Sequence, residues 1–82
     1  MAMLNAHAID ESLSEMRRSS GLTLEEVGRQ LGEILGRPPY THPRIIQIEQ
    51  EGTRDTDQLE ALARIYSRPF EAVYIAAKKL RK

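Results

Sequence analysis

The sequence predicts an all-α fold, a five-helix bundle that forms one small domain over residues 1–82. Three observations support this prediction. Apolar residues recur with helical spacing in five segments, capping or turn residues separate those segments, and we find no convincing strand pattern. A chain of this length supports a single hydrophobic core and leaves little room for a deep substrate cleft.

The first predicted helix runs from about Ala8 to Ser19 and ends before a turn at residues 20 and 21. Its apolar face consists of Ile9, Leu13 and Met16, which follow one another at intervals of a helical turn. Residues 1–7 precede this periodic segment, and we expect them to form a flexible N-terminal arm.

The second predicted helix has the clearest start in the sequence. Thr23, followed three residues later by Glu26, predicts a capping box, in which each side chain accepts a hydrogen bond from the other residue's backbone N–H. Either Gly32 or Gly36 ends this helix, because glycine readily takes the left-handed conformation found at helix ends. The apolar period continues past Gly32, so we favour an end at about Leu35, shortly before two consecutive prolines.

Each of the remaining three helices is marked by a cap or a stop. The third begins near Thr41, His42 or Pro43 and ends at residue 50 or 51, before a glycine at residue 52. Asp55 and Gln58 resemble a capping pair for the fourth helix, which continues to residue 66. Pro69 fits the first turn of the last helix, and residues 78–82 form a basic C-terminal tail that suits the negative end of that helix.

Composition indicates a soluble protein and gives little support for catalysis. Hydrophobic residues make up 40% of the chain, charged residues make up 29%, and there is no cysteine. The only histidines, His7 and His42, lie in separate segments without metal-ligand spacing. We therefore expect neither enzyme activity nor a metal or cofactor. No signal peptide precedes the first helix and no apolar run is long enough to span a bilayer, so we expect a cytoplasmic protein and no membrane partner.

The net charge of the chain is zero, but the charges are distributed unevenly. Residues 1–77 contain eight arginines, no lysine and all twelve acids, whereas four of the last five residues are basic. This distribution does not require a bare polyanion as a partner. If the protein binds nucleic acid, its basic side chains must gather on one face and the acids must lie elsewhere.

Three segments occur in order over about residues 9–75: SEMRRSSGLTLEEVGRQLG, RIIQIEQEGTR and LEALARIYSRPFEAVY. Together they resemble the Cro/repressor-type helix-turn-helix family of bacterial and phage regulators, the XRE family. The resemblance implies the five-helix fold of the lambda-repressor type and double-stranded DNA as the ligand. It also implies that the third helix is a recognition helix, which enters the major groove of DNA.

Two structural roles follow from the resemblance. Gly28 lies inside the second helix, where glycine costs about 1 kcal/mol relative to alanine, and it is expected to be the small contact where the second helix crosses the third. Arg17 and Glu49 correspond to an ion pair that ties the first helix to the third. The alternative is that these two residues are separate, solvated charges.

The resemblance also implies which residues contact DNA. The candidates for reading bases project away from the apolar stripe of the third helix, and they are Thr41, His42, Arg44, Ile46, Gln47 and Gln50. Arg44 suits guanine and Gln47 suits adenine. Ile46 either contacts a thymine methyl group or is buried because the helix is rotated. The candidates for phosphate contacts are Thr23, Arg37, Tyr40 and Arg54.

Two features depart from the family pattern. Leu24 stands where the family commonly has a glutamine that contacts DNA, so that contact is absent. The connection between the second and third helices is longer than usual, which puts the angle between these helices in question. Within this connection, either Arg37, Tyr40 and His42 add contacts to the groove or the phosphates of DNA, or Pro38, Pro39 and Tyr40 only pack the loop against the protein.

These inferences lead to an expected function. We expect a sequence-specific double-stranded-DNA-binding transcriptional regulator of bacterial or phage origin, a repressor that binds a palindromic operator as a homodimer. Tyr74, Ala77 and Leu80 either form the dimer interface or complete the core of a single chain. The rival hypothesis is an antitoxin or adaptor, which uses the same fold to bind a partner protein such as a toxin or another regulator. The acidic balance of residues 1–77 favours this rival.

Overall fold

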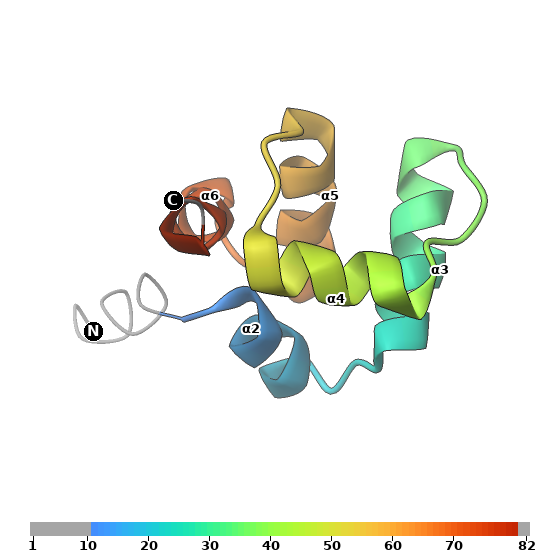
Figure 1. Ribbon diagram of the computed structural model, residues 1–82, viewed down its shortest axis with the longest axis horizontal. Helices are drawn as coiled ribbons and strands as arrows, with labels where there is room; N and C mark the ends of the chain where they lie inside the picture. Colours follow the sequence, from blue (N-terminus) through green and yellow to red (C-terminus); the bar gives the residue numbers. More distant parts are fainter. Residues whose placement is uncertain (1–10, 81–82) are drawn as a thin grey trace.

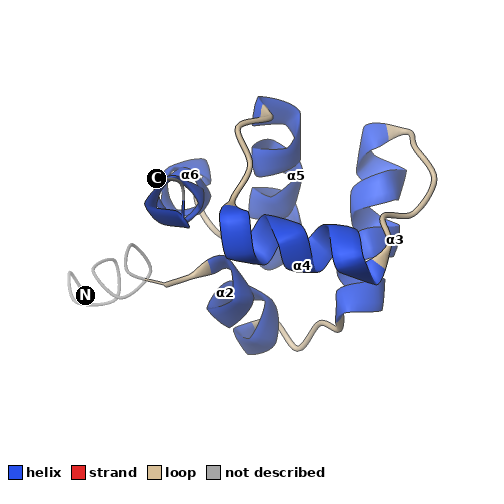
Figure 2. Cartoon of the chain, in the orientation of Figure 1, coloured by secondary structure: helices blue, strands red, loops and turns tan. Residues whose placement is uncertain are grey.

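Five α-helices follow one another in residues 11–80, the part of the chain that the computed structural model describes (Figure 1). They are α2 (Leu13–Ser19), α3 (Leu24–Leu35), α4 (His42–Glu51), α5 (Thr56–Tyr66) and α6 (Phe70–Leu80). No strand occurs within these residues (Figure 2), so the predicted all-α fold class is confirmed. The expected N-terminal arm, Ile9 and the last two residues of the basic tail lie outside the described residues.

The helices enclose one hydrophobic core, to which each of them contributes. α5 packs against both α3 and α6, and α4 lies across the front of the bundle, where it packs against the same two helices (Figure 1). The largest core side chains are less than 2% exposed and are Leu13, Met16, Val27, Leu31, Ile45, Leu62, Tyr66 and Val73. Because α4 turns only its Ile45–Ile48 stripe toward this core, its opposite face remains exposed.

The predicted helix boundaries are wrong at two starts. α2 begins at Leu13 and not near Ala8, because Ser12 has an extended backbone and closes a capping box with Glu15. α6 begins at Phe70, and the carbonyl oxygen of Pro69 accepts from the backbone N–H of Val73 at 3.3 Å. Pro69 therefore lies at the cap of α6 and not within its first turn.

The other predicted boundaries are confirmed. The Thr23–Glu26 capping box begins α3, and Gly36 ends this helix with a left-handed backbone (φ 68°), so Gly32 is not the stop. The hydroxyl of Thr41 accepts from the N–H of Arg44 and caps α4. Asp55 caps α5 by accepting from two backbone N–H groups, but the side chain of its expected partner, Gln58, points elsewhere.

The connection between α3 and α4, residues 36–41, lies directly on α3 at two of its glycines. A Cβ atom on Gly32 would sit 2.7 Å from the carbonyl oxygen of Pro38, and a Cβ atom on Gly28 would overlap the carbonyl oxygen of Tyr40. The backbone N–H of Tyr40 also donates to the Gly28 carbonyl oxygen at 3.0 Å. Gly28 was expected to meet the third helix; its tightest neighbour is instead the loop backbone just before α4, while Ile45 of α4 is in ordinary contact. This packing fixes the point where α4 begins.

An ion pair joins the segment that precedes α2 to the turn after α5. The carboxylate of Glu11 accepts hydrogen bonds from Nε and Nη2 of Arg68 at 2.7 and 2.9 Å, and Arg68 also donates to the Tyr66 carbonyl oxygen at 3.1 Å. These hydrogen bonds from Arg68 hold the pKa of Glu11 below its ordinary value of 4.5.

We expect this pair to make stability sensitive to acid. Because the folded-state pKa of Glu11 lies below its unfolded-state value, its contribution is fully present above about pH 4.5 and is lost as the pH falls through the folded-state pKa. Urea unfolding of the wild type and of Glu11→Gln, measured from neutral to acid pH, tests this. The variant should be less stable at neutral pH and should lose less stability in acid. Parallel acid losses in the two proteins would contradict a role for the pair.

Candidate nucleic-acid interface

The exposed face of α4, together with its N-cap, carries all six residues predicted to read bases. Each of them is exposed, and they are Thr41, His42, Arg44, Ile46, Gln47 and Gln50. Ile46 is 38% exposed, while its neighbours Ile45 and Ile48 are buried. Of the two alternatives for Ile46, burial is therefore wrong, because α4 turns this side chain away from the core.

Arg17 and Glu49 form the ion pair that the family resemblance implies. Arg17 Nε donates to Glu49 Oε2 at 2.6 Å, and Arg17 Nη1 donates to the Leu22 carbonyl oxygen at 3.2 Å. The two side chains are only 16% and 10% exposed. The pair therefore holds α4 to α2 and to the turn after α2, and it neutralises an acid that would otherwise lie beside the exposed face of α4.

Arg44 lies over the aromatic ring of Tyr40, with its guanidinium carbon 5.4 Å from the ring centre. The Tyr40 hydroxyl accepts from Nε2 of Gln58 at 3.1 Å, and Oε1 of Gln58 accepts from the Thr53 hydroxyl at 2.6 Å. Tyr40 is partly buried against the core. Of the alternatives left open for the connection, the one observed is that Tyr40 packs the loop against the protein. The predicted phosphate contact of Tyr40 stays a prediction.

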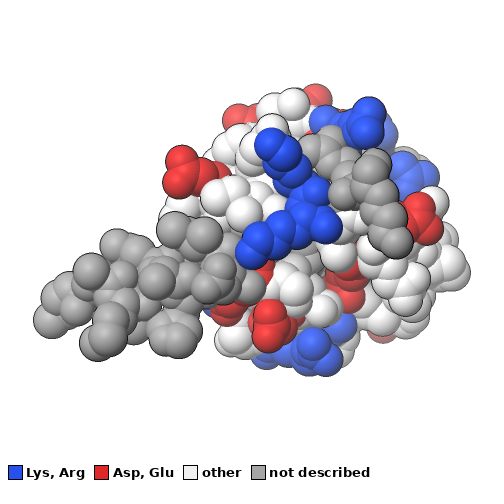
Figure 3. Space-filling view, turned by 60° about the vertical axis from the view of Figure 1, so that its left-hand side comes forward, with Lys and Arg blue, Asp and Glu red and all other residues white. Residues whose placement is uncertain are grey.

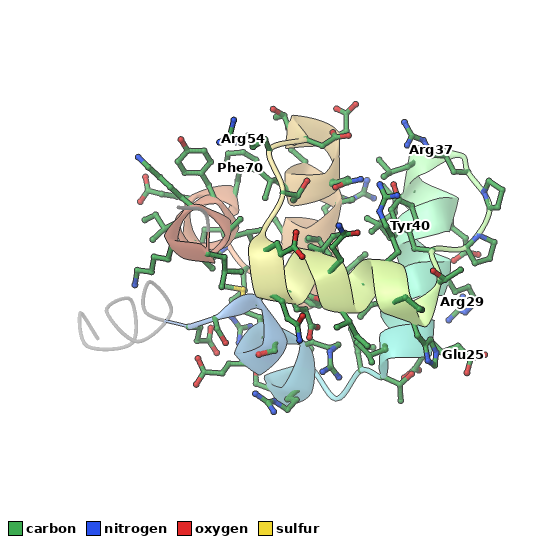
Figure 4. The ribbon with its side chains drawn as sticks, in the orientation of Figure 1. Glu25, Arg29, Arg37, Tyr40, Arg54 and Phe70 are labelled. Atoms are coloured by element: carbon green, nitrogen blue, oxygen red, sulfur yellow. The ribbon has the colours of Figure 1, made fainter. Side chains whose placement is uncertain are left out.

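The remaining phosphate candidates divide into two groups. Arg37 and Arg54 are exposed, and in the view of Figure 4 both lie on the same side of α4, Arg37 near the end of α3 and Arg54 toward the other end of α4. Thr23 is less suitable, because its hydroxyl accepts from the N–H of Glu26 and donates to the carboxylate of Glu26. Glu25 and Glu26 also place two carboxylates at this helix end, where they oppose an incoming phosphate. The structure therefore argues against Thr23 as a phosphate contact.

Exposed basic and acidic side chains both lie around α4. Arg37, Arg44 and Arg54 are exposed there, and the nearby acids are the exposed Glu51 and Asp55 and the paired Glu49. Seen from the side of α6, Lys and Arg side chains form a band with Asp and Glu side chains beside it (Figure 3). Arg44 separates two hollows of about 320 and 350 Å³, one formed with the connection after α3 and the other with the start of α5.

The predicted dimer interface is largely part of the core. Ala77 is buried, and its backbone packs against Gly52, so the assignment of Ala77 to a dimer interface is wrong. Leu80 is partly buried against the same core. The reason is that these residues share the inward face of α6 with Val73. Tyr74 alone of the three is exposed, and its ring stacks on Phe70 with 6.2 Å between the ring centres.

A groove of about 650 Å³ lies between the end of α3, α5 and the start of α6. Its exposed apolar side chains are Ile34 and Phe70, and Asp57, Glu60 and Arg64 line it from α5. These α5 residues lie on the side of the helix away from Gln58, which faces the flanks of α4, so the groove and the exposed face of α4 lie on different sides of the molecule.

The sequence pattern does not single out Gln58, which holds Tyr40 and Thr53 in place. A signal is nevertheless present. Gln58, Leu62 and Tyr66 are spaced four apart and all are buried, so Gln58 is a polar residue on the apolar stripe of its helix. Because Gln58 also fits a capping pair with Asp55, its place on the apolar stripe was not recognised. No comparable signal links Glu11 to Arg68, because these residues are far apart in the sequence and belong to different turns.

No family model, curated protein or solved structure matches the chain, so the family resemblance stays an expectation drawn from the sequence. Within residues 11–80, no three His, Cys, Asp or Glu side chains come together in a group able to hold a metal ion. None of the helices described here is both long enough and apolar enough to cross a membrane.

Proposed function

We propose that the protein is a sequence-specific binder of double-stranded DNA that regulates transcription, with α4 as its recognition helix. The observation that supports this most directly is the exposed outer face of α4, where an arginine and two glutamines stand beside an exposed isoleucine. An α-helix fits the major groove of B-form DNA, and these are side chains that distinguish base pairs there. The family resemblance of the sequence supports the same proposal.

The spacing on α4 suits the reading of successive base pairs. Arg44 and Gln47 are three residues apart, so they are separated by about 4.5 Å along the helix axis, which exceeds the rise of about 3.4 Å between base pairs and lets them reach different base pairs. In this proposal Arg44 donates to guanine and Gln47 forms paired hydrogen bonds with adenine. Ile46 contacts a thymine methyl group, and Arg37 and Arg54 bind phosphates beyond the two ends of the helix.

One copy of this domain reads only half of a palindromic site. We therefore propose a repressor that binds as a homodimer, with its two α4 helices about 34 Å apart. Tyr74, stacked on Phe70 at the surface of α6, remains the candidate contact between the two copies. A pool of random duplexes selected with the protein tests this directly, because a dimer selects a palindrome.

Replacing Arg44 with alanine is expected to weaken binding to the selected duplex by about 1 to 3 kcal/mol. Thermal stability should change little, because the Arg44 side chain is exposed. Fluorescence anisotropy with the selected duplex and thermal unfolding measure the two effects. The matched control is Arg64→Ala, which removes an exposed arginine from the groove on the other side of α5 and should leave DNA binding unchanged. An Arg44→Ala variant that unfolds, or that binds as the wild type does, would contradict our assignment of the helix faces.

Binding at several salt concentrations tests the proposal as a whole. Neutralised phosphates release counterions, so the logarithm of the binding constant should fall linearly with the logarithm of the salt concentration. A protein that binds neither random nor selected duplexes at low salt is not a DNA-binding regulator.

The second candidate function is an antitoxin or adaptor, and the groove between α3, α5 and α6 favours it. Exposed Ile34 and Phe70 with a rim that includes Asp57 and Glu60 would suit an apolar partner segment that carries a basic residue. Failure to bind DNA at low salt, together with a partner whose binding is lost in Phe70→Ser, would support this function instead.

A further inference from the structure

We propose that Gln58 and Tyr40 are positioning residues for base reading, which fix the direction of Arg44 before DNA is bound. The inference rests on the proposed function, in which Arg44 reads a base. It goes beyond that function by naming a buried device, formed by α5 and the connection between α3 and α4, that determines how selectively Arg44 reads.

The side chain of Gln58 links the two flanks of α4. Tyr40 lies two residues before α4 and Thr53 lies two residues after it. Gln58 donates to the Tyr40 hydroxyl at 3.1 Å and accepts from the Thr53 hydroxyl at 2.6 Å. The Thr53 hydroxyl itself accepts from the backbone N–H of Asp55, the N-cap of α5. Both flanks of the recognition helix are therefore held by one side chain of α5.

Burial makes this link rigid. Gln58 is only 4% exposed, and within residues 11–80 no buried side-chain nitrogen or oxygen lacks a hydrogen-bond partner. A buried amide that lost one of these partners would be left unsatisfied, which is unfavourable in a dry environment. Gln58 therefore holds Tyr40 and Thr53 in one arrangement.

The ring of Tyr40 is fixed at both of its ends. At the backbone end, its N–H donates to the Gly28 carbonyl oxygen, and its carbonyl oxygen packs closely on Gly28. At the other end, its hydroxyl accepts from Gln58. The result is an aromatic surface whose position is set by α3 and α5 together, at the place where α4 begins.

Arg44 lies on this surface, with its guanidinium carbon 5.4 Å from the centre of the Tyr40 ring. A free arginine side chain samples many rotamers and loses that freedom when it binds a base. Stacking on an aromatic ring restricts it in advance, and restricting one such side chain is equivalent to about a two- to tenfold gain in affinity. Only the base that suits the fixed direction of Arg44 benefits from this gain in affinity. The gain therefore appears as a preference for that base over the others.

The test compares three variants with the wild type. Tyr40→Phe keeps the ring and removes the hydroxyl that accepts from Gln58. Gln58→Met removes the amide that donates to this hydroxyl and keeps a side chain of similar length. Tyr40→Leu removes the ring. For each variant, we measure the dissociation constant for the selected duplex and for a duplex in which only the base pair read by Arg44 is exchanged. The ratio of the two dissociation constants measures how strongly the protein prefers the correct base pair. The base pair read by Arg44 is the one at which Arg44→Ala abolishes this preference.

We expect the ratio to fall by about two- to tenfold in Tyr40→Leu and by a smaller factor in Gln58→Met and Tyr40→Phe, while affinity for random duplex DNA stays constant. NMR of the free protein supplies a readout that needs no DNA. The Arg44 side-chain protons should be shifted upfield by the Tyr40 ring in the wild type, and this shift should disappear in Tyr40→Leu and shrink in Gln58→Met.

Ser12→Ala is the control for a general loss of stability. It removes the N-cap of α2, at the opposite end of this helix from Arg17, and it touches neither the network nor the exposed face of α4, so it should lower the melting temperature without changing the discrimination ratio. If the discrimination ratio falls equally in Ser12→Ala, then Gln58 and Tyr40 have a purely structural role.

The outcomes separate this inference from the proposed function. A wild-type protein that shows no preference among duplexes overturns both. A preference that Arg44→Ala abolishes but Tyr40→Leu leaves intact overturns the positioning role alone. An Arg44 side chain without an upfield shift in the free wild-type protein also overturns it alone.

Discussion

Replacing Glu49 with leucine is expected to lower the free energy of unfolding by about 3 kcal/mol, because Arg17 then keeps a largely buried charge without a counterion. Both side chains of this pair are mostly shielded from water, and Arg17 retains only its hydrogen bond to the Leu22 carbonyl oxygen. Urea unfolding of the wild type and of Glu49→Leu measures the difference.

Two further variants show whether that loss of stability comes from the buried ion pair. Arg29→Ala breaks the exposed pair between Arg29 and Glu33 within α3, and it should change stability by only about 0.3 to 0.5 kcal/mol. The double variant Arg17→Met with Glu49→Leu replaces the whole pair by apolar side chains, and it should recover most of the lost stability. If Glu49→Leu costs no more than Arg29→Ala, then the pair is solvated and does not hold α4 in place.

Replacing Gly28 with valine is expected to lower the free energy of unfolding by about 3 kcal/mol and to weaken DNA binding as well. The added side chain would meet the carbonyl oxygen of Tyr40, which is backbone and cannot rotate away as a flexible side chain does. The connection would have to lift from α3, and its hydrogen bond from the Tyr40 N–H to the Gly28 carbonyl oxygen would break. Unfolding in urea and the affinity for the selected duplex measure the two effects.

Gly28→Ala is the sharper version of this experiment. In an exposed helix, replacing glycine by alanine stabilises by about 1 kcal/mol. Here the single methyl group already overlaps the loop, so we expect a net loss of stability that is smaller than for valine. A gain of about 1 kcal/mol in Gly28→Ala would show that the connection does not lie on this part of α3 in solution.

Local signals account for the parts of the fold that the sequence predicted well. Thr23 with Glu26, Gly36 and Asp55 act on backbone groups within a few residues of themselves, so their effects can be recognised without knowing the rest of the fold. The incorrect start of α2 has the same origin. The apolar period through Ile9 favoured an early start, whereas the capping box of Ser12 and Glu15, an equally local signal, determines the actual one.

The parts that were not predicted depend on contacts between distant segments. Whether Ile46 is exposed depends on the path of residues 36–41 over α3, and no local sequence pattern reveals that path. Ala77 is small and lies on an amphipathic helix, so its burial becomes apparent only when the loop at Gly52 packs against it. The partners of Gln58 come from residues 40 and 53, which approach it only once α4 is in place.

The inner and outer faces of α4 differ in their contacts, and this difference determines which positions of the helix can be substituted. Its inner face carries Ile45, Ile48 and Glu49, which hold the helix to the bundle. On its outer face, the side chains of Ile46, Gln47 and Gln50 make no hydrogen bond to any other residue in the described part of the chain. Substitutions at these three positions are thus nearly free of folding constraints. Under the proposed function, new binding preferences can therefore evolve, or be selected from a library, on an unchanged scaffold.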